Sequence, residues 1–193
     1  MSRPEPEDLN ALLHQCQKQQ KAAQTELYNW LAPKLLGLCL RYLPDHDNAE
    51  DVMQDAFVKI FLQLHKFRGE GSFEGWAKRI AVNTALTALK AQKKIYFERD
   101  LTIVENVDFT EEDPLQLSAE EIGACIQTLP SGYRTILNLF LIENFSHAEI
   151  AQQLGIGEST SRSQYARARQ VLMKMLKEKL HTQPDQTPNF IIH

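Results

Sequence analysis

The stretch "FSHAEIAQQLGIGESTSRSQYARARQVL", residues 145–172, decides the fold of the C-terminal part of the chain. Ser146 followed three residues later by Glu149 is a capping box, which predicts the start of a helix. Gly155 is placed to end that helix, and Gly157 allows the chain to turn into a second one. A short helix, a glycine-containing turn and a second helix are typical of a helix-turn-helix, whose second helix lies in a DNA major groove.

The second helix carries the side chains that we expect to contact DNA. Its early residues Ser159, Thr160 and Ser163 are small and allow close approach to a phosphate or a base edge. Arg162, Arg167 and Arg169 can neutralise phosphates or bind guanine through two hydrogen bonds. The alternative is a helical hairpin that only packs. That alternative leaves unexplained why residues 159–179 hold six Lys or Arg and one acidic residue.

Helical periodicity runs along almost the whole chain, without the sustained alternation that strands show. We therefore predict an all-α fold. Pro33 should bend or interrupt the second helix, Asp47 and Glu50 form a capping-box pattern at the third, and Ser72 is the expected N-cap of the fourth. The expected helices ahead of the helix-turn-helix cover residues 9–19, 22–42, 47–65, 73–93, 119–129 and 133–144.

The periodicity fails between these helices in one acidic run, "ENVDFTEEDPLQLS". Residues 93–121 carry three Lys or Arg and nine Asp or Glu, which predicts a flexible linker between two domains. The sequence therefore predicts two small helical domains at residues 9–94 and 119–180, joined by a linker at 95–118. Residues 181–193 should form a frayed tail.

Composition excludes several classes of protein. The longest apolar stretch, residues 31–43, is too short and too charged to span a bilayer, and the N-terminus lacks a signal-peptide core, so we expect a cytoplasmic protein without membrane insertion. The three cysteines are scattered and lack metal-ligand spacing, which favours buried thiols. With no nucleophile–base pair, metal cluster or phosphate-binding glycine loop, we predict no catalytic residues, no metal, no cofactor and no small-molecule substrate.

One helix of the N-terminal half places acidic groups along a polar side. In "NAEDVMQDAFVKIFLQLHKF", Asp51, Gln54, Asp55 and Lys59 lie opposite an apolar stripe. Paired carboxylates can catalyse proton transfer or bind a divalent metal, but no matching histidine, cysteine or nucleophile accompanies them. Two interpretations remain: a solvated acidic face, or a docking surface for a basic partner.

The next segment, "FRGEGSFEGWAKRIAVNTALTALKAQKK", sets aromatic side chains beside cations. That combination suits single-stranded nucleic acid, whose bases stack or enter pockets while charge holds the backbone. The alternative is that these rings pack in a hydrophobic core, because Phe73 and Trp76 at helical spacing are typical of a core. The nucleic-acid interpretation therefore depends on Lys78, Arg79 and Asn83.

The two halves together resemble bacterial RNA polymerase sigma factors of the extracytoplasmic-function (ECF) group of the sigma-70 family. "RYLPDHDNAEDVMQDAFVKIF" resembles the family segment that docks on RNA polymerase, and "FRGEGSFEGWAKRIAVNTALTALK" the segment that melts and captures the minus-ten strand. "LPSGYRTILNLFLIENFSHAEIAQQLGIGESTSRSQYARARQVL" resembles the minus-thirty-five-binding domain. The three segments occur in the family order.

The resemblance implies a non-enzymatic initiation factor that directs core RNA polymerase to promoter DNA, and it implies an anti-sigma factor as a further partner. The implied contacts with the beta-prime clamp helices come from Asp51, Gln54, Asp55 and Phe57. The implied minus-ten contacts come from Arg68, Ser72, Lys78, Arg79 and Asn83. The implied minus-thirty-five contacts come from Tyr133, Arg134, Ser159, Thr160, Arg162, Ser163, Gln164 and Arg167.

The chain also departs from the family pattern. Many members have a valine where Ser161 stands and a basic residue where Gln164 stands, so a promoter preference does not transfer. The "TSRSQ" helix is similar to that of Bacteroidetes-type sigma factors. Two other functions are weighed: a helix-turn-helix regulator that binds a palindromic operator as a dimer, and a helical adaptor that binds only protein.

Overall fold

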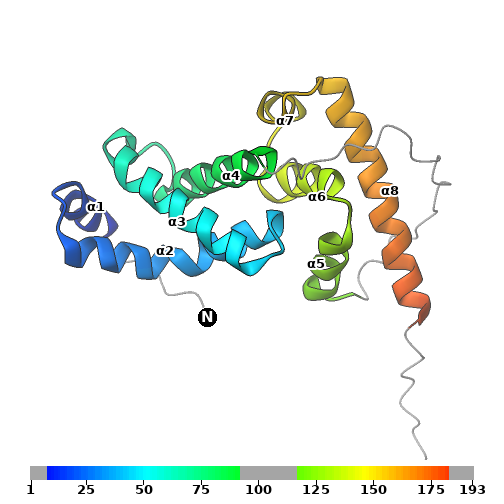
Figure 1. Ribbon diagram of the computed structural model, residues 1–193, viewed down its shortest axis with the longest axis horizontal. Helices are drawn as coiled ribbons and strands as arrows, with labels where there is room; N and C mark the ends of the chain where they lie inside the picture. Colours follow the sequence, from blue (N-terminus) through cyan, green and yellow to red (C-terminus); the bar gives the residue numbers. More distant parts are fainter. Residues whose placement is uncertain (1–7, 92–116, 183–193) are drawn as a thin grey trace, which may run out of the picture. The chain divides into compact units, whose positions relative to one another are not determined.

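The computed structural model describes residues 8–91 and 117–182, and every regular element in those ranges is helical (Figure 1). The predicted all-α class is therefore confirmed. The chain divides into two compact units, which we describe separately. Of the expected linker at residues 95–118, residues 95–116 lie outside the described residues, and so does the tail beyond residue 182. Within those ranges, the structure contains no helix that is both long and apolar enough to cross a membrane.

The first unit is a bundle of four α-helices and one 3-10 turn. The turn η1 covers Leu64–Lys66. Helix α3 packs on both α2 and α4, α2 packs on α4, and α1 packs on α2. Leu31 and Leu35 of α2 and Ile60 of α3 are completely buried in the shared core. The four helices are α1 (Leu9–Gln17), α2 (Lys21–Tyr42), α3 (His46–Gln63) and α4 (Phe73–Ala91).

Three local details of this unit differ from the sequence predictions. Helix α1 ends two residues early because Gln19 adopts a left-handed backbone with φ of 59°. Pro33 does not interrupt α2, since its exposed ring puts the missing hydrogen bond on the solvent side of the helix. The predicted capping by Asp47 is wrong. Asp45 caps α3 instead, accepting a hydrogen bond from Asn48 N at 2.9 Å, and the helix begins one residue earlier.

The second unit contains four α-helices and a short π-helical segment. Its core joins the long last helix to α5 and α6. The core residues are Leu117, Cys125, Leu129, Tyr133, Leu137, Ala168, Leu172 and Leu176. The elements are α5 (Ala119–Thr128), α6 (Ser131–Leu137), η3 (Asn138–Ile142), α7 (His147–Leu154) and α8 (Glu158–Thr182).

The helix expected at residues 133–144 is divided in the structure. It begins earlier, at Ser131 after Pro130, and changes from α to π geometry at Asn138. Glu143 N donates to Asn138 O at 3.0 Å, which is the wider π-type hydrogen bond. Asn144 then takes a left-handed backbone with φ of 57°, and the chain turns into the helix-turn-helix.

Candidate protein- and DNA-binding surfaces

Helix α3 presents an exposed stripe that is acidic in one half and apolar in the other. Asp51, Asp55, Val58 and Leu62 follow the spacing that puts side chains on one helical face. Asp51 and Asp55 are exposed, and Val58 and Leu62 expose 58% and 69% of their surfaces. The acidic half was predicted from the sequence; the apolar half was not, although the same helical spacing indicates it.

The other two residues expected to bind polymerase, Gln54 and Phe57, both contact Tyr28 of α2. Gln54 is exposed and donates from Nε2 to the Tyr28 hydroxyl of α2 at 3.3 Å. Phe57 is buried, with its ring centroid 4.6 Å from that of Tyr28. Phe57 therefore fixes α3 against α2, whereas Asp51 and Asp55 remain accessible to a partner.

The loop before α4 is anchored by aromatic rings and shaped by two glycines. Phe67 contacts Phe73 and Trp76, with ring centroids 5.3 and 5.6 Å away. Gly69 and Gly71 have φ angles of 78° and 85°, which side chains other than glycine rarely adopt. The aromatic residues thus belong largely to the packed base of the loop, as the alternative interpretation held, and Arg68 lies exposed on the loop.

Ser72 caps α4, as predicted: its Oγ accepts a hydrogen bond from Gly75 N at 3.1 Å. Glu74 in the first turn of α4 forms two ion pairs. Lys78, one turn after Glu74, pairs with it at 2.7 Å, and Lys34 of α2 pairs with the same carboxylate at 2.5 Å. Burial alone would raise the pKa of Glu74, but the hydrogen bonds from the two lysines outweigh it, and the pKa is lowered. Glu74 was not predicted from the sequence, although its spacing to Lys78 is that of a helical ion pair.

Arg79 and Asn83 lie one turn apart on α4, and they differ in accessibility. Arg79 is exposed. Asn83 is half-buried, and its Oδ1 is enclosed without a hydrogen-bond partner among the described residues. Arg68, Lys78 and Arg79 therefore supply the accessible positive charge of the predicted minus-ten surface.

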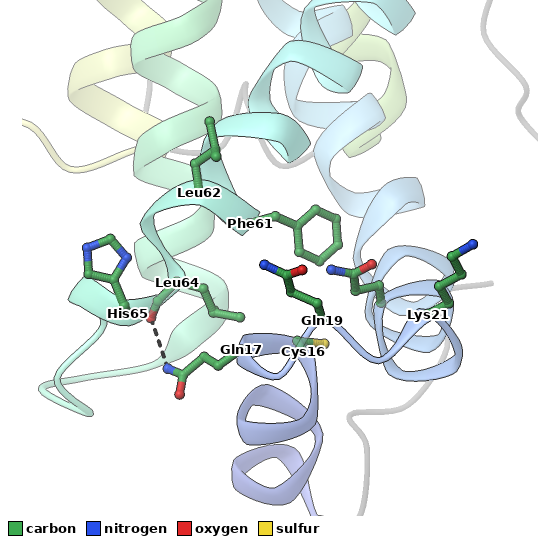
Figure 2. Close-up of a pocket in the computed structure, with 9 residues that line it drawn as sticks. Cys16, Gln17, Gln19, Lys21, Phe61, Leu62, Leu64 and His65 are labelled. Atoms are coloured by element: carbon green, nitrogen blue, oxygen red, sulfur yellow. Dashed lines mark hydrogen bonds between the residues drawn. The ribbon is translucent and has the colours of Figure 1, made fainter.

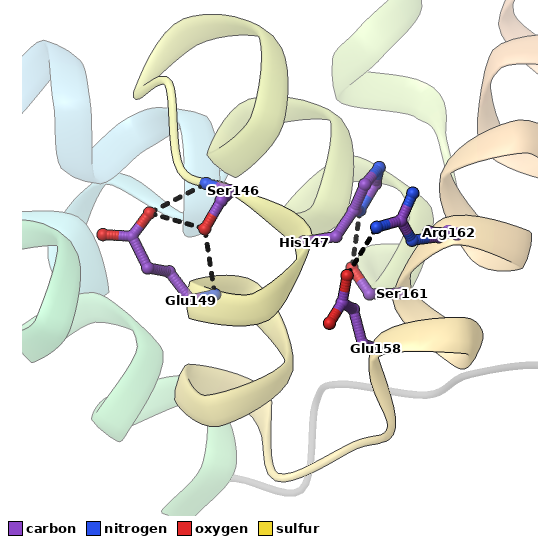
Figure 3. Close-up of polar contacts among 6 residues, drawn as sticks. All are labelled: Ser146, His147, Glu149, Glu158, Ser161 and Arg162. Atoms are coloured by element: carbon purple, nitrogen blue, oxygen red, sulfur yellow. Dashed lines mark hydrogen bonds and ion pairs between the residues drawn. The ribbon is translucent and has the colours of Figure 1, made fainter.

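The helix-turn-helix forms as predicted (Figure 3). Ser146 and Glu149 make the reciprocal capping box: Glu149 N donates to Ser146 Oγ at 3.2 Å, and Ser146 N donates to Glu149 Oε2 at 2.9 Å. Gly155 ends α7 with φ of 71°. Glu158, which the sequence analysis missed, opens α8 and pairs with Arg162 at 2.5 Å.

The first turns of α8 are divided between an outer and an inner side. Ser159, Arg162 and Ser163 are exposed, while Thr160 and Arg167 are half-buried. Ser161 and Gln164 are buried, and the Gln164 Oε1 has no hydrogen-bond partner in the described part of the chain. The outer side of α8 is thus small, hydroxylated and positively charged, as a major-groove helix requires.

Two residues expected near the minus-thirty-five backbone lie in the interior of the second unit. Tyr133 belongs to the hydrophobic core and is 2% exposed. Arg134 is buried, and its Nη1 donates to Gln127 O at 2.8 Å, near the end of α5. Burial lowers the pKa of Arg134. In this structure Arg134 therefore satisfies carbonyl groups of α5 instead of facing a ligand.

A surface pocket of about 500 Å³ lies between the α1–α2 turn and the end of α3 (Figure 2). Gln17 spans it, donating from Nε2 to Leu64 O at 3.3 Å. Cys16 lines it but is only 3% exposed, and burial, aided by Glu26, raises the pKa of the thiol to about 11. A thiol in that state is a poor nucleophile.

Comparison with known families identifies both units. Residues 27–95 match the model of sigma-70 region 2, and residues 119–172 match that of sigma-70 region 4. The chain is 36% identical over 157 residues to the RNA polymerase sigma-H factor of Pseudomonas aeruginosa, covering 75% of this chain and 81% of the relative. The chain belongs to the ECF sigma-70 family. As a sigma factor it is not an enzyme; it binds core RNA polymerase and directs it to promoters through regions 2 and 4.

Other sigma factors are similar to the chain over most of its length. It is 32% identical to the ECF sigma-E factor of Haemophilus influenzae over 174 residues, which are 84% of this chain and 92% of the relative. It is 33% identical to the ECF sigma-E factor of Escherichia coli K12 over 151 residues, which are 72% of this chain and 78% of the relative. Among solved structures, CnrH in complex with the cytosolic domain of CnrY is 21% identical with a TM-score of 0.48, covering 87% of this chain and 96% of that one.

Proposed function

We propose that this sigma factor binds the beta-prime clamp helices of RNA polymerase through the exposed stripe of α3. The observation that carries the proposal is the continuity of Asp51 and Asp55 with Val58 and Leu62 on one helical face. Carboxylates attract a basic partner and orient it, and exposed apolar side chains supply area that becomes buried on binding. Gln54 flanks the stripe, and Phe57 contributes by holding α3 in place.

For the minus-ten element we propose a surface made of the loop before α4 together with the half-buried Lys78 and the exposed Arg79 of α4. Arg68, Ser72, Lys78 and Arg79 would hold the unpaired strand, and the glycine-shaped loop would receive a flipped base. Unstacking one base costs about a few kcal/mol, which these contacts must return. The enclosed Oδ1 of Asn83 supports a structural role for that residue instead of direct contact.

For the minus-thirty-five element we propose that the outer side of α8 enters the major groove. Ser159, Thr160, Arg162, Ser163 and Arg167 are the residues that would contact DNA. The buried positions of Gln164, Tyr133 and Arg134 argue for leaving these three out of the contact set. Because the whole chain has a net charge of −4, we expect weak DNA binding without polymerase.

Two further expectations follow from family membership alone. The first is regulation by an anti-sigma factor, which the resemblance to ECF sigma factors implies. The second is action in the cytoplasm, where RNA polymerase and DNA are found. The suggested Bacteroidetes-type lineage stays a prediction, and the relatives named above, from Pseudomonas, Haemophilus and Escherichia, lend it no support.

The experiment is run-off transcription with core RNA polymerase on a library of genomic fragments. The native chain should give discrete transcripts that map to start sites sharing a minus-ten and a minus-thirty-five element. An Arg162→Ala variant should lose the transcripts that depend on the minus-thirty-five element, while an Asp51→Ala/Asp55→Ala variant should lose all of them. Unchanged transcripts from the double aspartate variant would contradict the proposed polymerase site.

A further inference from the structure

One contact joins the two helices of the helix-turn-helix at a buried residue of α8 (Figure 3). His147 is the first residue of α7, and its Nδ1 lies 3.0 Å from Oγ of Ser161 in the first turn of α8. Ser161 is completely buried, whereas the next residue, Arg162, is exposed. The hydrogen bond therefore lies directly behind the side chains that we propose to contact the minus-thirty-five duplex.

The His147 ring is also held from two elements. It stacks on Phe140 of η3, with centroids 4.5 Å apart and an interplanar angle of 17°. Tyr165, one turn further along α8, approaches the edge of the imidazole with centroids 5.6 Å apart and contacts Phe140 at 4.5 Å. Three mutually contacting rings and one polar link thus fix α8 relative to both α7 and η3.

We propose that His147 is a positioning residue for the recognition helix: its hydrogen bond to Ser161 and its stacking against Phe140 set the angle at which the first turns of α8 meet DNA. This inference rests on the proposed minus-thirty-five role of α8. Ser159 and Arg162 flank Ser161 closely, so displacement of Ser161 moves the contact residues with it. A set of DNA-contacting side chains tolerates a displacement of only about 0.5 Å.

The charges around His147 also predict that promoter binding depends on pH. Burial lowers the pKa of His147 and Arg162 lowers it further, while Glu158 acts in the opposite direction. Both charged residues lie on α8; Phe140 is uncharged, Tyr165 contributes a phenol, and Glu149 on α7 is engaged with Ser146. The neutral ring is therefore the form that this position favours, and protonation opposes the packed arrangement.

The test uses holoenzyme assembled from native core polymerase and full-length sigma variants. The probe is a duplex carrying the promoter of the strongest transcript from the run-off experiment. His147→Phe keeps a ring but removes Nδ1, and Ser161→Ala removes the hydroxyl that Nδ1 contacts. The double variant completes a double-mutant cycle. His14→Phe is the control, because His14 is an exposed histidine on α1.

We expect each single variant to weaken promoter binding about three- to tenfold, the range set by one hydrogen bond with a buried partner. The double variant should be no weaker than the worse single one, and His14→Phe should match the native chain. The loss should vanish on a template that is pre-melted at minus ten and lacks a minus-thirty-five duplex. Native binding should also weaken as the pH falls below about 6.5, and this dependence should be reduced in His147→Phe.

Several outcomes would overturn the inference. Unchanged binding, additive losses, or a loss that tracks a fall in helix content by circular dichroism would each assign His147 to packing alone. An Arg162→Ala variant separates this failure from that of the proposed function. If Arg162→Ala weakens binding and the His147 and Ser161 variants do not, only the positioning role fails; if Arg162→Ala has no effect, the minus-thirty-five role of α8 fails as well.

Discussion

Lys78 and Glu74 form an ion pair one turn apart on α4, with Nζ 2.7 Å from Oε1, and the second carboxylate oxygen of Glu74 pairs with Lys34 of α2. Lys34 also lies over the Trp30 ring, 4.7 Å from its centroid. The carboxylate therefore connects two helices beside the proposed minus-ten surface. Its negative charge also offsets the cation that we expect to hold the promoter strand.

Glu74→Gln should strengthen the binding of holoenzyme to a single-stranded minus-ten oligonucleotide. Removing the carboxylate releases Lys78 for phosphate contact and removes a charge that repels the backbone. We expect a gain of about two- to fivefold at low salt that shrinks as salt rises. Fluorescence anisotropy with a labelled non-template strand measures the gain. Lys78→Gln should weaken binding instead, and equal effects of the two variants would contradict the assignment.

The same ion pairs predict how the stability of the first unit depends on pH. The pKa of Glu74 is lowered in the folded chain, so its stabilising contribution is present above the ordinary carboxylate pKa of 4.5 and is lost as the pH falls through and below it. Because the group is partly exposed, we expect at most about 1 kcal/mol. In urea unfolding from pH 6 to about pH 3, the free energy of unfolding should fall less for Glu74→Gln than for the native chain. An identical pH profile for both chains would contradict the prediction.

Arg134→Met should destabilise the second unit. The change removes the donor to Gln127 O, leaving a carbonyl without its charged partner, at a cost of about 2 kcal/mol. Thermal unfolding followed by circular dichroism measures it, with Lys174→Met as a control because Lys174 is exposed on α8. Unchanged stability combined with weaker promoter binding would instead assign Arg134 to the DNA backbone, as the family resemblance implies.

Gly69→Ala should strain the loop before α4, since an alanine at φ of 78° costs about 1 kcal/mol. Promoter opening, followed by permanganate reactivity of unpaired thymines, should decline because the loop can no longer hold its shape. Gly37→Ala is the matched control: Gly37 lies in helix α2 with open space around its Cβ position, and alanine there should stabilise the helix. Normal opening with Gly69→Ala would show that the loop conformation is not required.

Helix type and most helix starts could be predicted from sequence because capping residues act locally. Ser72 and the Ser146–Glu149 pair are examples, and both form as expected. The start of α3 was missed because two aspartates compete for one cap, and local pattern does not rank Asp45 over Asp47. The π segment at η3 was missed because it depends on tertiary packing, not on residue periodicity.

The candidate sites were predictable in location but less so in composition. Residues of one helical face, such as Asp51 and Asp55, can be grouped by spacing alone. Spacing does not reveal that Arg134 is buried in its own unit, because a lone arginine in an apolar helix can point inward or outward. It also does not reveal that His147 contacts Ser161, since that contact depends on how α7 and α8 pack.

The central claim is that the exposed stripe of α3 binds RNA polymerase, and the dissociation constant of the sigma–core complex tests it most directly. The comparison is between the native chain, Asp51→Asn/Asp55→Asn, and the charge-matched control Glu26→Gln/Glu50→Gln, whose residues are exposed on α2 and α3. We predict a loss on the order of tenfold or more for the aspartate variant and less than about twofold for the control. Equal affinities for the two variants would show that net charge, and not this stripe, governs binding, and would contradict the claim.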